Sequence, residues 1–182
     1  MRNLLNNMRV MIIGAVGLLL LLAFLWFKGG KVTLQEKKSL VSLTDAELRF
    51  IYEKYSGVVK IYLPHYPSLN LELILAMIGV ESRGKQDETG AHGEFGSMQV
   101  KQVALSDFNS YYSRQYAMND LFNLYYGVEV GMGYLNLRFV KWKEMSKAIR
   151  AYNQGDGGAD SFEAWDYFYN VENVRSQFKN ME

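Results

Sequence analysis

The sequence contains no cysteine, only two prolines and two histidines, and almost no excess of charge of either sign. Without cysteine the chain forms no disulfide and offers no thiolate to a metal, and two histidines argue against a histidine-rich metal centre. A formal net charge of +1, without a long basic run, argues against a nucleic-acid-binding protein. The sequence therefore predicts a protein with no metal, no cofactor and no nucleic-acid partner.

An apolar run covers residues 10–27, with Trp26 and Phe27 at its end and basic residues on both sides. As a helix it would be about 27 Å long, close to the hydrocarbon thickness of a bilayer. A cleaved signal peptide has a shorter apolar region followed by small residues, whereas Trp-Phe-Lys-Gly-Gly follows here. We therefore expect a single-pass membrane anchor at residues 10–27, after a short tail at 1–9 and before a tether at 28–42. The flanking basic residues leave its orientation open.

The rest of the chain, residues 43–182, shows helical spacing of apolar residues and no convincing strand. It predicts one all-α domain that is large enough for a hydrophobic core. Thr44 and Glu47 form a capping-box pattern before the first helix. Asn70 is the expected N-cap of an apolar helix, and Ser161 is that of the last helix. Helices are expected at residues 45–62, 71–82, 98–108, 121–140, 141–152 and 162–178, with an irregular segment over 106–117.

The same spacing predicts two details of packing. Tyr125, Phe162 and Trp165 fall on the apolar faces of their helices and are expected to point inward. Glycines such as Gly131 and Gly133 would each cost about 1 kcal/mol relative to alanine inside a helix. We expect them to permit the close approach of a neighbouring helix.

The stretch from Glu81 to Gln99 joins a carboxyl group at the end of an apolar helix to a glycine-rich loop. A helix C-terminus and apolar surroundings both disfavour a negative charge. They therefore favour the protonated form of Glu81, which a general acid needs. A glutamate at a helix end is, taken alone, more often a solvated residue, so this prediction depends on the residues around it.

Six residues of this stretch stand at the spacing of the signature of the lytic transglycosylases of the soluble-lytic and goose-lysozyme type: Glu81, Ser82, Gly93, Gly96, Met98 and Gln99. Two later blocks follow in the order of that family, Gly-Met-Gly-Tyr-Leu over 131–135 and Ala-Ile-Arg-Ala-Tyr-Asn-Gln-Gly over 148–155. Tyr167 and Val171 match its last helix. The chain resembles this family over about residues 70–172.

The resemblance implies a lysozyme-like (SLT) fold and an enzyme that cleaves peptidoglycan glycan strands with one catalytic acid, Glu81. In this family the acid protonates the bond between N-acetylmuramic acid and N-acetylglucosamine, and the muramoyl 6-hydroxyl then closes a 1,6-anhydro ring. The resemblance also implies that Tyr152 orients Glu81. The other matching substrate-binding or orienting positions are Ser82, Met98, Gln99 and Asn153.

The sequence departs from the family pattern at Gly90, which stands in place of a serine, and at Glu94, which stands in place of an alanine. These departures leave the acid in place. Separately, two alternatives remain open. Glu88 or Glu94 could supply the second carboxyl group of a lysozyme-type hydrolase that uses water. A non-catalytic glycan-binding or structural module of an envelope or virion would need no acid at all.

The expected partners are peptidoglycan glycan strands and, through residues 10–27, a lipid bilayer. The resemblance and the small domain are typical of enzymes that open the cell wall locally, for an envelope-spanning secretion apparatus or for a phage particle. The expected location is a bacterial inner membrane with the catalytic domain on the periplasmic side facing the cell wall, or a virion membrane if a phage encodes the chain.

Overall fold

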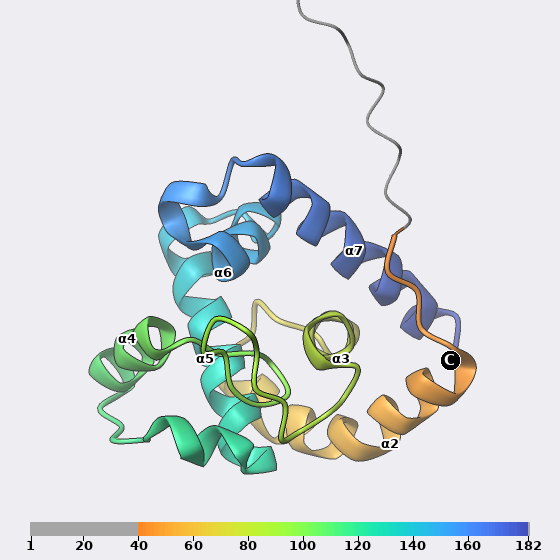
Figure 1. The fold of residues 1–182 in the computed structure, drawn as a ribbon, viewed down its shortest axis with the longest axis horizontal. Helices are drawn as coiled ribbons and strands as arrows, with labels where there is room; N and C mark the ends of the chain where they lie inside the picture. The colour runs from red at the N-terminus through yellow and green to blue at the C-terminus, as the bar shows by residue number, and fades with distance from the viewer. Residues whose placement is uncertain (1–39, 182) are drawn as a thin grey trace, which may run out of the picture. The chain divides into compact units, whose positions relative to one another are not determined.

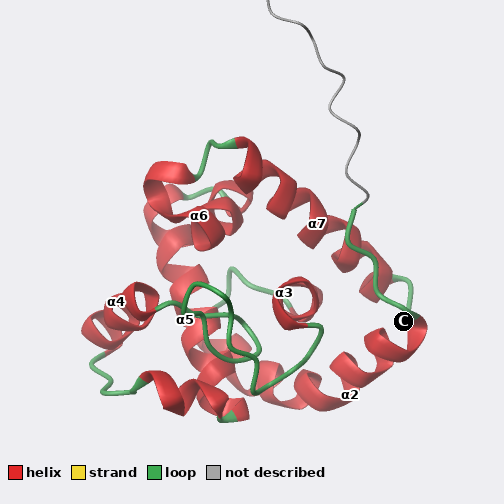
Figure 2. Cartoon of the chain, in the orientation of Figure 1, coloured by secondary structure: helices red, strands yellow, loops and turns green. Residues whose placement is uncertain are grey.

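The computed structural model describes residues 40–181, which form six α-helices and two 3-10 helices (Figures 1 and 2). The α-helices are α2 (Asp45–Tyr62), α3 (Leu71–Ser82), α4 (Gln102–Tyr112), α5 (Leu124–Trp142), α6 (Met145–Gly158) and α7 (Phe162–Lys179). The 3-10 helices are η1 (Leu63–His65) and η2 (Met118–Phe122). Over residues 40–181, β structure is limited to two isolated bridges, Thr89 with Phe95 and Phe95 with Val100. The predicted all-α fold is confirmed.

Local capping chemistry fixes where the principal helices begin. The Thr44 side chain accepts a hydrogen bond from the Glu47 amide, and the Glu47 carboxylate accepts one from the Thr44 amide, which completes the predicted capping box of α2. Asn70 Oδ1 accepts a hydrogen bond of 3.0 Å from the Leu73 amide at the start of α3. Ser161 caps α7 in the same way. All three predicted N-caps are confirmed.

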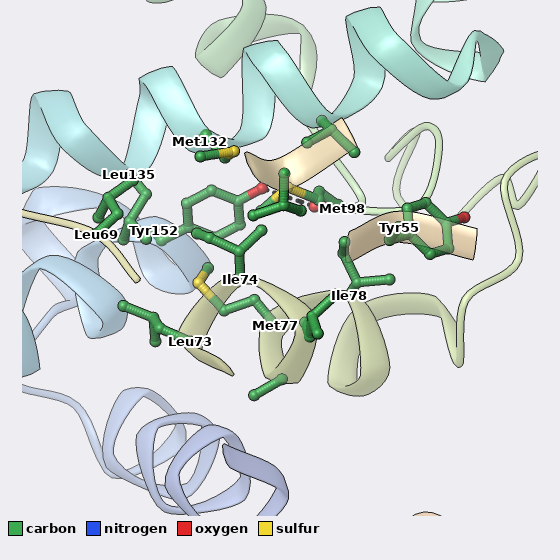
Figure 3. Close-up of a cluster of buried hydrophobic side chains, with 14 of the residues drawn as sticks. Tyr55, Leu69, Leu73, Ile74, Met77, Ile78, Met98, Met132, Leu135 and Tyr152 are labelled. Atoms are coloured by element: carbon green, nitrogen blue, oxygen red, sulfur yellow. Dashed lines mark hydrogen bonds between the residues drawn. The ribbon is translucent and has the colours of Figure 1, made fainter. Parts of the chain in front are cut away.

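Helix α3 is the central element and is seen end-on in Figure 1, between α2 and α7. Its residues 73–79 are all buried, as expected for a helix that is apolar nearly all round. In Figure 3, Ile74, Met77 and Ile78 of α3 lie in one cluster with Met132 and Leu135 of α5. Packing on several sides holds α3, and this fixes the position of its C-terminal residues Glu81 and Ser82.

The glycines of α5 allow close approach, as predicted. A Cβ atom at Gly131 would overlap the Met98 side chain and lie only 2.8 Å from Met98 Cβ. A Cβ atom at Gly133 would overlap the ring of Phe108 in α4. The neighbour of Gly131 is therefore a loop residue rather than a helix, and the neighbour of Gly133 is a helix.

Helices α4, α5 and α6 differ from the prediction at both ends. They begin at Gln102, Leu124 and Met145 instead of 98, 121 and 141. α4 includes residues 106–112, a range predicted to be irregular. α5 ends at Trp142 because Lys143 adopts a left-handed conformation, with φ of 56°, and closes the helix. α6 continues beyond residue 153 to Gly158, across a kink at Gly155, whose φ is 71°.

The inward orientation predicted for three aromatic residues is wrong. Tyr125, Phe162 and Trp165 are exposed by 48%, 62% and 37%, respectively. The buried residues of α7 are Ala164, Tyr167, Val171, Val174 and Phe178. Helix α7 carries aromatic residues on more than one face, so spacing alone does not determine which face packs against α3.

The predicted anchor at residues 10–27, the tail at 1–9 and most of the tether at 28–42 lie outside the described residues. Within residues 40–181, no helix combines the length and the hydropathy that crossing a membrane requires. The last residues of the tether, where they are described, pack on α7. The Val41 amide donates a hydrogen bond of 2.9 Å to Asn170 Oδ1.

Candidate active site

A cleft of about 420 Å³ opens beside the C-terminal end of α3. Its walls come from the end of α3 and the loop after it, the start of α4, the middle of α5 and the second half of α6. Four of the predicted site residues line it: Glu81, Gln99, Tyr152 and Asn153. These four residues come from two motif blocks, 81–99 and 148–155, and Tyr134 of the third block, 131–135, lines the same cleft.

Glu81 is the penultimate residue of α3, and its side chain is half-buried at the cleft. Burial raises the pKa of its carboxyl group to about 7, because the surrounding protein desolvates the charged form. A hydrogen bond from Tyr167 and the charge of Lys101 lower this pKa, whereas the charge of Glu94 raises it. At neutral pH the carboxyl group is thus divided between its acid and base forms, as predicted for a general acid.

Tyr167 makes the direct contact with the catalytic candidate. Its hydroxyl donates a hydrogen bond of 2.6 Å to Glu81 Oε1, from the buried face of α7. Burial raises the pKa of Tyr167 well above its ordinary value, so the hydroxyl keeps its proton and remains a donor. The sequence pattern matched Tyr167 to the last helix of the family but assigned it no role.

Tyr152 was expected to orient Glu81, and the structure gives it a different hydrogen bond. Its hydroxyl donates to the main-chain carbonyl oxygen of Met98 at 2.7 Å (Figure 3). Tyr152 lines the cleft near Glu81, but its hydroxyl is hydrogen-bonded to the loop and not to Glu81. Tyr152 therefore fixes the loop against α6, and Tyr167 has the orienting contact.

Ser82 and Met98 do not line the cleft, although the resemblance implies substrate-binding or orienting positions for both. Met98 is fully buried, and Gly131 leaves room for its side chain. The buried Ser82 hydroxyl lies 2.8 Å from the Ser97 carbonyl oxygen and 3.2 Å from that of Ile78. Ser82 thus ties the end of α3 to the loop that carries Met98.

Gln99 combines a place in the cleft wall with a structural role. Its side-chain amide nitrogen donates hydrogen bonds to the carbonyl oxygens of Gly96, at 2.9 Å, and Glu88, at 3.2 Å. These bonds link the end of the glycine-rich loop to residues earlier in the same loop. Asn153 lines the cleft from the second half of α6, where Oδ1 accepts a hydrogen bond from the neighbouring Gln154.

The two candidates for a second acid occupy different places. Glu94 lines the cleft and forms an ion pair of 3.4 Å with Lys101. Glu88 does not line the cleft, and its carboxylate pairs with Lys85 at 3.2 Å. Glu94 is thus the one of the two that shares a cleft with Glu81. Across residues 40–181, no group of three or more acidic or histidine side chains is arranged to hold a metal ion.

Two comparisons with known proteins found matches to this chain. Residues 65–172 match the family model described as the transglycosylase SLT domain. An inactive mutant of the lytic transglycosylase Slt from Pseudomonas aeruginosa aligns over 68% of this chain with 18% identity and a TM-score of 0.54. The 70 kDa soluble lytic transglycosylase from Escherichia coli aligns over 72% of the chain with 15% identity and a TM-score of 0.63.

At these identities the structural likeness shows a shared fold. The chain covers only 22% and 25% of the lengths of those two enzymes. No curated protein sequence matches the chain. The family model covers more than half of the chain, and it spans the motif blocks that carry the resemblance. The chain therefore belongs to the transglycosylase SLT family.

Proposed function

We propose that the chain is a peptidoglycan lytic transglycosylase in which Glu81 is the single catalytic acid and base. The observation that carries this proposal is the half-buried carboxyl group at the cleft, with a pKa raised to about 7 by burial. Such a group can give a proton and take one back at the same pH. A non-catalytic module would have no need for a carboxyl group held in this state.

In the proposed reaction, protonated Glu81 gives its proton to the glycosidic oxygen between N-acetylmuramic acid and N-acetylglucosamine. The bond from that oxygen to C1 of the muramoyl residue breaks, and the carboxylate remains on the enzyme. Glu81 then takes the proton of the muramoyl 6-hydroxyl group, while the oxygen of that hydroxyl group forms a bond to C1. The products are a 1,6-anhydromuramoyl end and a free 4-hydroxyl group, and no water is consumed.

The hydrogen bond from Tyr167 suits this sequence of steps. The Tyr167 hydroxyl lies 2.6 Å from Glu81 Oε1, where it stabilises the carboxylate formed after the first proton transfer. It also fixes the direction of the carboxyl group, and the proposed reaction uses the other oxygen for the proton transfers. Because one residue performs both proton transfers, the reaction requires no second carboxyl group.

A lysozyme-type hydrolase is the second candidate, because Glu94 lies in the same cleft. In that reaction Glu94 would activate water or stabilise the cation at C1. Against this role, Glu94 Oε2 accepts a hydrogen bond of 2.9 Å from the His92 amide, and Oε1 faces Lys101. Both carboxylate oxygens are therefore already engaged.

The proposal extends to the place where the enzyme acts. The apolar run at residues 10–27 supports anchorage in a lipid bilayer, with the catalytic domain facing the cell wall. This would be the bacterial inner membrane with the domain in the periplasm, or a virion membrane. A small anchored enzyme of this kind suits the local opening of the wall for an envelope-spanning secretion apparatus or for phage entry.

The test is to digest purified peptidoglycan with the full-length chain and with Glu81→Gln, and to weigh the products by mass spectrometry. The proposal predicts 1,6-anhydro products from the wild type and none from the variant. Products heavier by one water, with reducing ends, would establish the hydrolase. A folded wild-type chain that binds peptidoglycan but leaves the glycan intact would establish the non-catalytic module.

A further inference from the structure

We propose that Glu94 and Lys101 form a positioning pair in the cleft wall, in which Glu94 helps to keep the proton on Glu81 and Lys101 limits that effect. This inference rests on the proposed function, because it assigns the control of the proton that Glu81 transfers. It concerns two residues outside the matched signature, and it gives Glu94 a role other than that of a second catalytic acid.

The first observation is that Glu94 is fixed in the cleft rather than free in solvent. Its side chain is only 14% exposed, although it belongs to a loop. The Glu94 carboxylate accepts a hydrogen bond of 2.9 Å from the His92 amide and pairs with Lys101 Nζ at 3.4 Å. The Glu94 main chain is also held, because its carbonyl oxygen accepts a hydrogen bond of 2.8 Å from the Gly90 amide.

The second observation is that Gly90 provides the space that the Glu94 side chain occupies. A Cβ atom at Gly90 would overlap Glu94 Oε2 and lie 2.6 Å from Gln99 Oε1 and 3.0 Å from Glu94 Cβ. The two departures from the family pattern, a glycine for a serine at position 90 and a glutamate for an alanine at position 94, therefore depend on each other. A side chain is lost at position 90, and a larger, charged side chain enters the same space from position 94.

The third observation concerns the groups that act on Glu81 from each neighbouring element. Tyr167 from α7 and Tyr152 from α6 remain neutral, because burial raises the pKa of each well above its ordinary value. Glu94 and Lys101 line the same cleft as Glu81 and supply the charges there, and their effects on Glu81 are opposite in sign. Burial raises the pKa of Glu94, but the backbone hydrogen bonds and Lys101 lower it by more, so Glu94 is ionised when Glu81 titrates.

These observations lead to a simple electrostatic argument. A fixed negative charge near Glu81 makes the second negative charge on the Glu81 carboxylate less favourable, and so it favours the proton. The positive charge of Lys101 acts in the opposite sense and also holds Glu94 in place. Removing the charge of Glu94 or that of Lys101 should therefore shift the pKa of Glu81, and the two shifts should have opposite directions.

The experiment compares Glu94→Gln and Lys101→Gln in the full-length chain by the pH dependence of kcat/KM on peptidoglycan. Activity falls at high pH where Glu81 loses its proton. Glu94→Gln should move this alkaline limb to lower pH, and Lys101→Gln should move it to higher pH, each by about half to one pH unit. Glu88→Gln and Lys85→Gln are matched controls, because they break the neighbouring loop pair, which does not line the cleft. The controls should not move the limb.

A second readout does not depend on turnover. The carboxyl carbon of Glu81, assigned by its loss in Glu81→Gln, can be titrated by NMR in the wild type and in the same variants. The inference is wrong if Glu94→Gln leaves this titration unmoved, if both variants move it in one direction, or if the controls move it equally. Loss of cleavage in a folded Glu94→Gln with an unmoved titration would instead assign Glu94 a direct role in the reaction.

Failure of the inference is distinct from failure of the proposed function. If the wild type forms no anhydro products, the proposed function fails, whatever the titration shows. If the wild type forms them and the pair does not move the Glu81 titration, only the positioning role fails.

Discussion

The Tyr167 hydroxyl donates a hydrogen bond of 2.6 Å to Glu81 Oε1, across 86 positions of the sequence. The contact joins the last helix to the end of the central helix, and α3 and α7 pack directly against each other. Helix α7 is therefore part of the candidate active site and not only a cover for the core. Because the bond favours the carboxylate, it opposes the effect of burial on Glu81.

Tyr167→Phe tests the role of this bond. Its loss removes an interaction that stabilises the carboxylate, so the pKa of Glu81 should rise above about 7 and the alkaline limb of the rate profile should move to higher pH. We expect kcat to fall by roughly tenfold to a hundredfold, the range that corresponds to one hydrogen bond to a charged group. The measurement is the pH profile of peptidoglycan cleavage.

The matched control is Tyr169→Phe in the same helix, since Tyr169 is 53% exposed and keeps its ring in the variant. It should leave both kcat and the profile unchanged. If Tyr167→Phe retained the wild-type rate and profile, the hydrogen bond would have no part in the reaction.

Tyr152→Phe separates support of the loop from control of the acid. The variant removes the donor to the Met98 carbonyl oxygen, a buried acceptor, and should lower the free energy of unfolding by about 1–3 kcal/mol. Because the Tyr152 hydroxyl does not bond to Glu81, the pH of the alkaline limb should change much less than in Tyr167→Phe. Urea denaturation and the rate profile together provide the check.

The exposed Tyr125 of α5 supplies a comparison, and Tyr125→Phe should alter the unfolding free energy by less than about 0.5 kcal/mol. An unchanged stability for Tyr152→Phe, combined with a large loss of activity, would place the Tyr152 hydroxyl on the substrate instead of on the loop.

The sequence was sufficient to predict features that depend on neighbouring residues. The caps at Thr44, Asn70 and Ser161 were predictable because each side chain bonds to an amide three residues later. The raised pKa of Glu81 was predictable because the apolar residues of a helix desolvate a carboxyl group at its end.

Features that depend on distant residues were not predictable in the same way. The match of Tyr167 to the last helix of the family predicted no contact for it. Only the packing of α7 on α3 determines that Tyr167 faces Glu81, whereas Tyr169 is exposed. The break between α5 and α6 falls at Lys143, a residue type that gives no signal for a left-handed conformation. The use of Gly90 as space for Glu94 depends on the folded loop.

Gly131→Ala tests the close approach of α5 to the loop. Alanine favours a helix by about 1 kcal/mol over glycine, but its Cβ would overlap the Met98 side chain, and Met98 Cβ cannot move without the main chain. We expect a net loss of about 1–3 kcal/mol in the free energy of unfolding. Gly57→Ala in α2 meets no atom within 4 Å and should instead stabilise the protein by about 0.5–1 kcal/mol. Equal effects of the two substitutions in thermal or urea unfolding would contradict the close contact.

Glu81→Gln should change how stability depends on pH, even without substrate. The pKa of Glu81 is about 7 in the folded chain, above the ordinary value of 4.5 that applies after unfolding. The stability that this group contributes is therefore fully present below pH 4.5 and is lost as the pH rises through about 7, by about 3 kcal/mol in total. Glutamine has no proton to lose, so the free energy of unfolding of the variant should rise by this amount relative to the wild type between pH 4.5 and 8.

Urea unfolding across that range measures this difference. Tyr167→Phe provides the comparison, because a higher pKa of Glu81 should make its loss of stability with rising pH larger than that of the wild type. Parallel stability curves for wild type and Glu81→Gln would show that the carboxyl group titrates normally in the folded protein, and the acid–base role proposed for it would lose its physical basis.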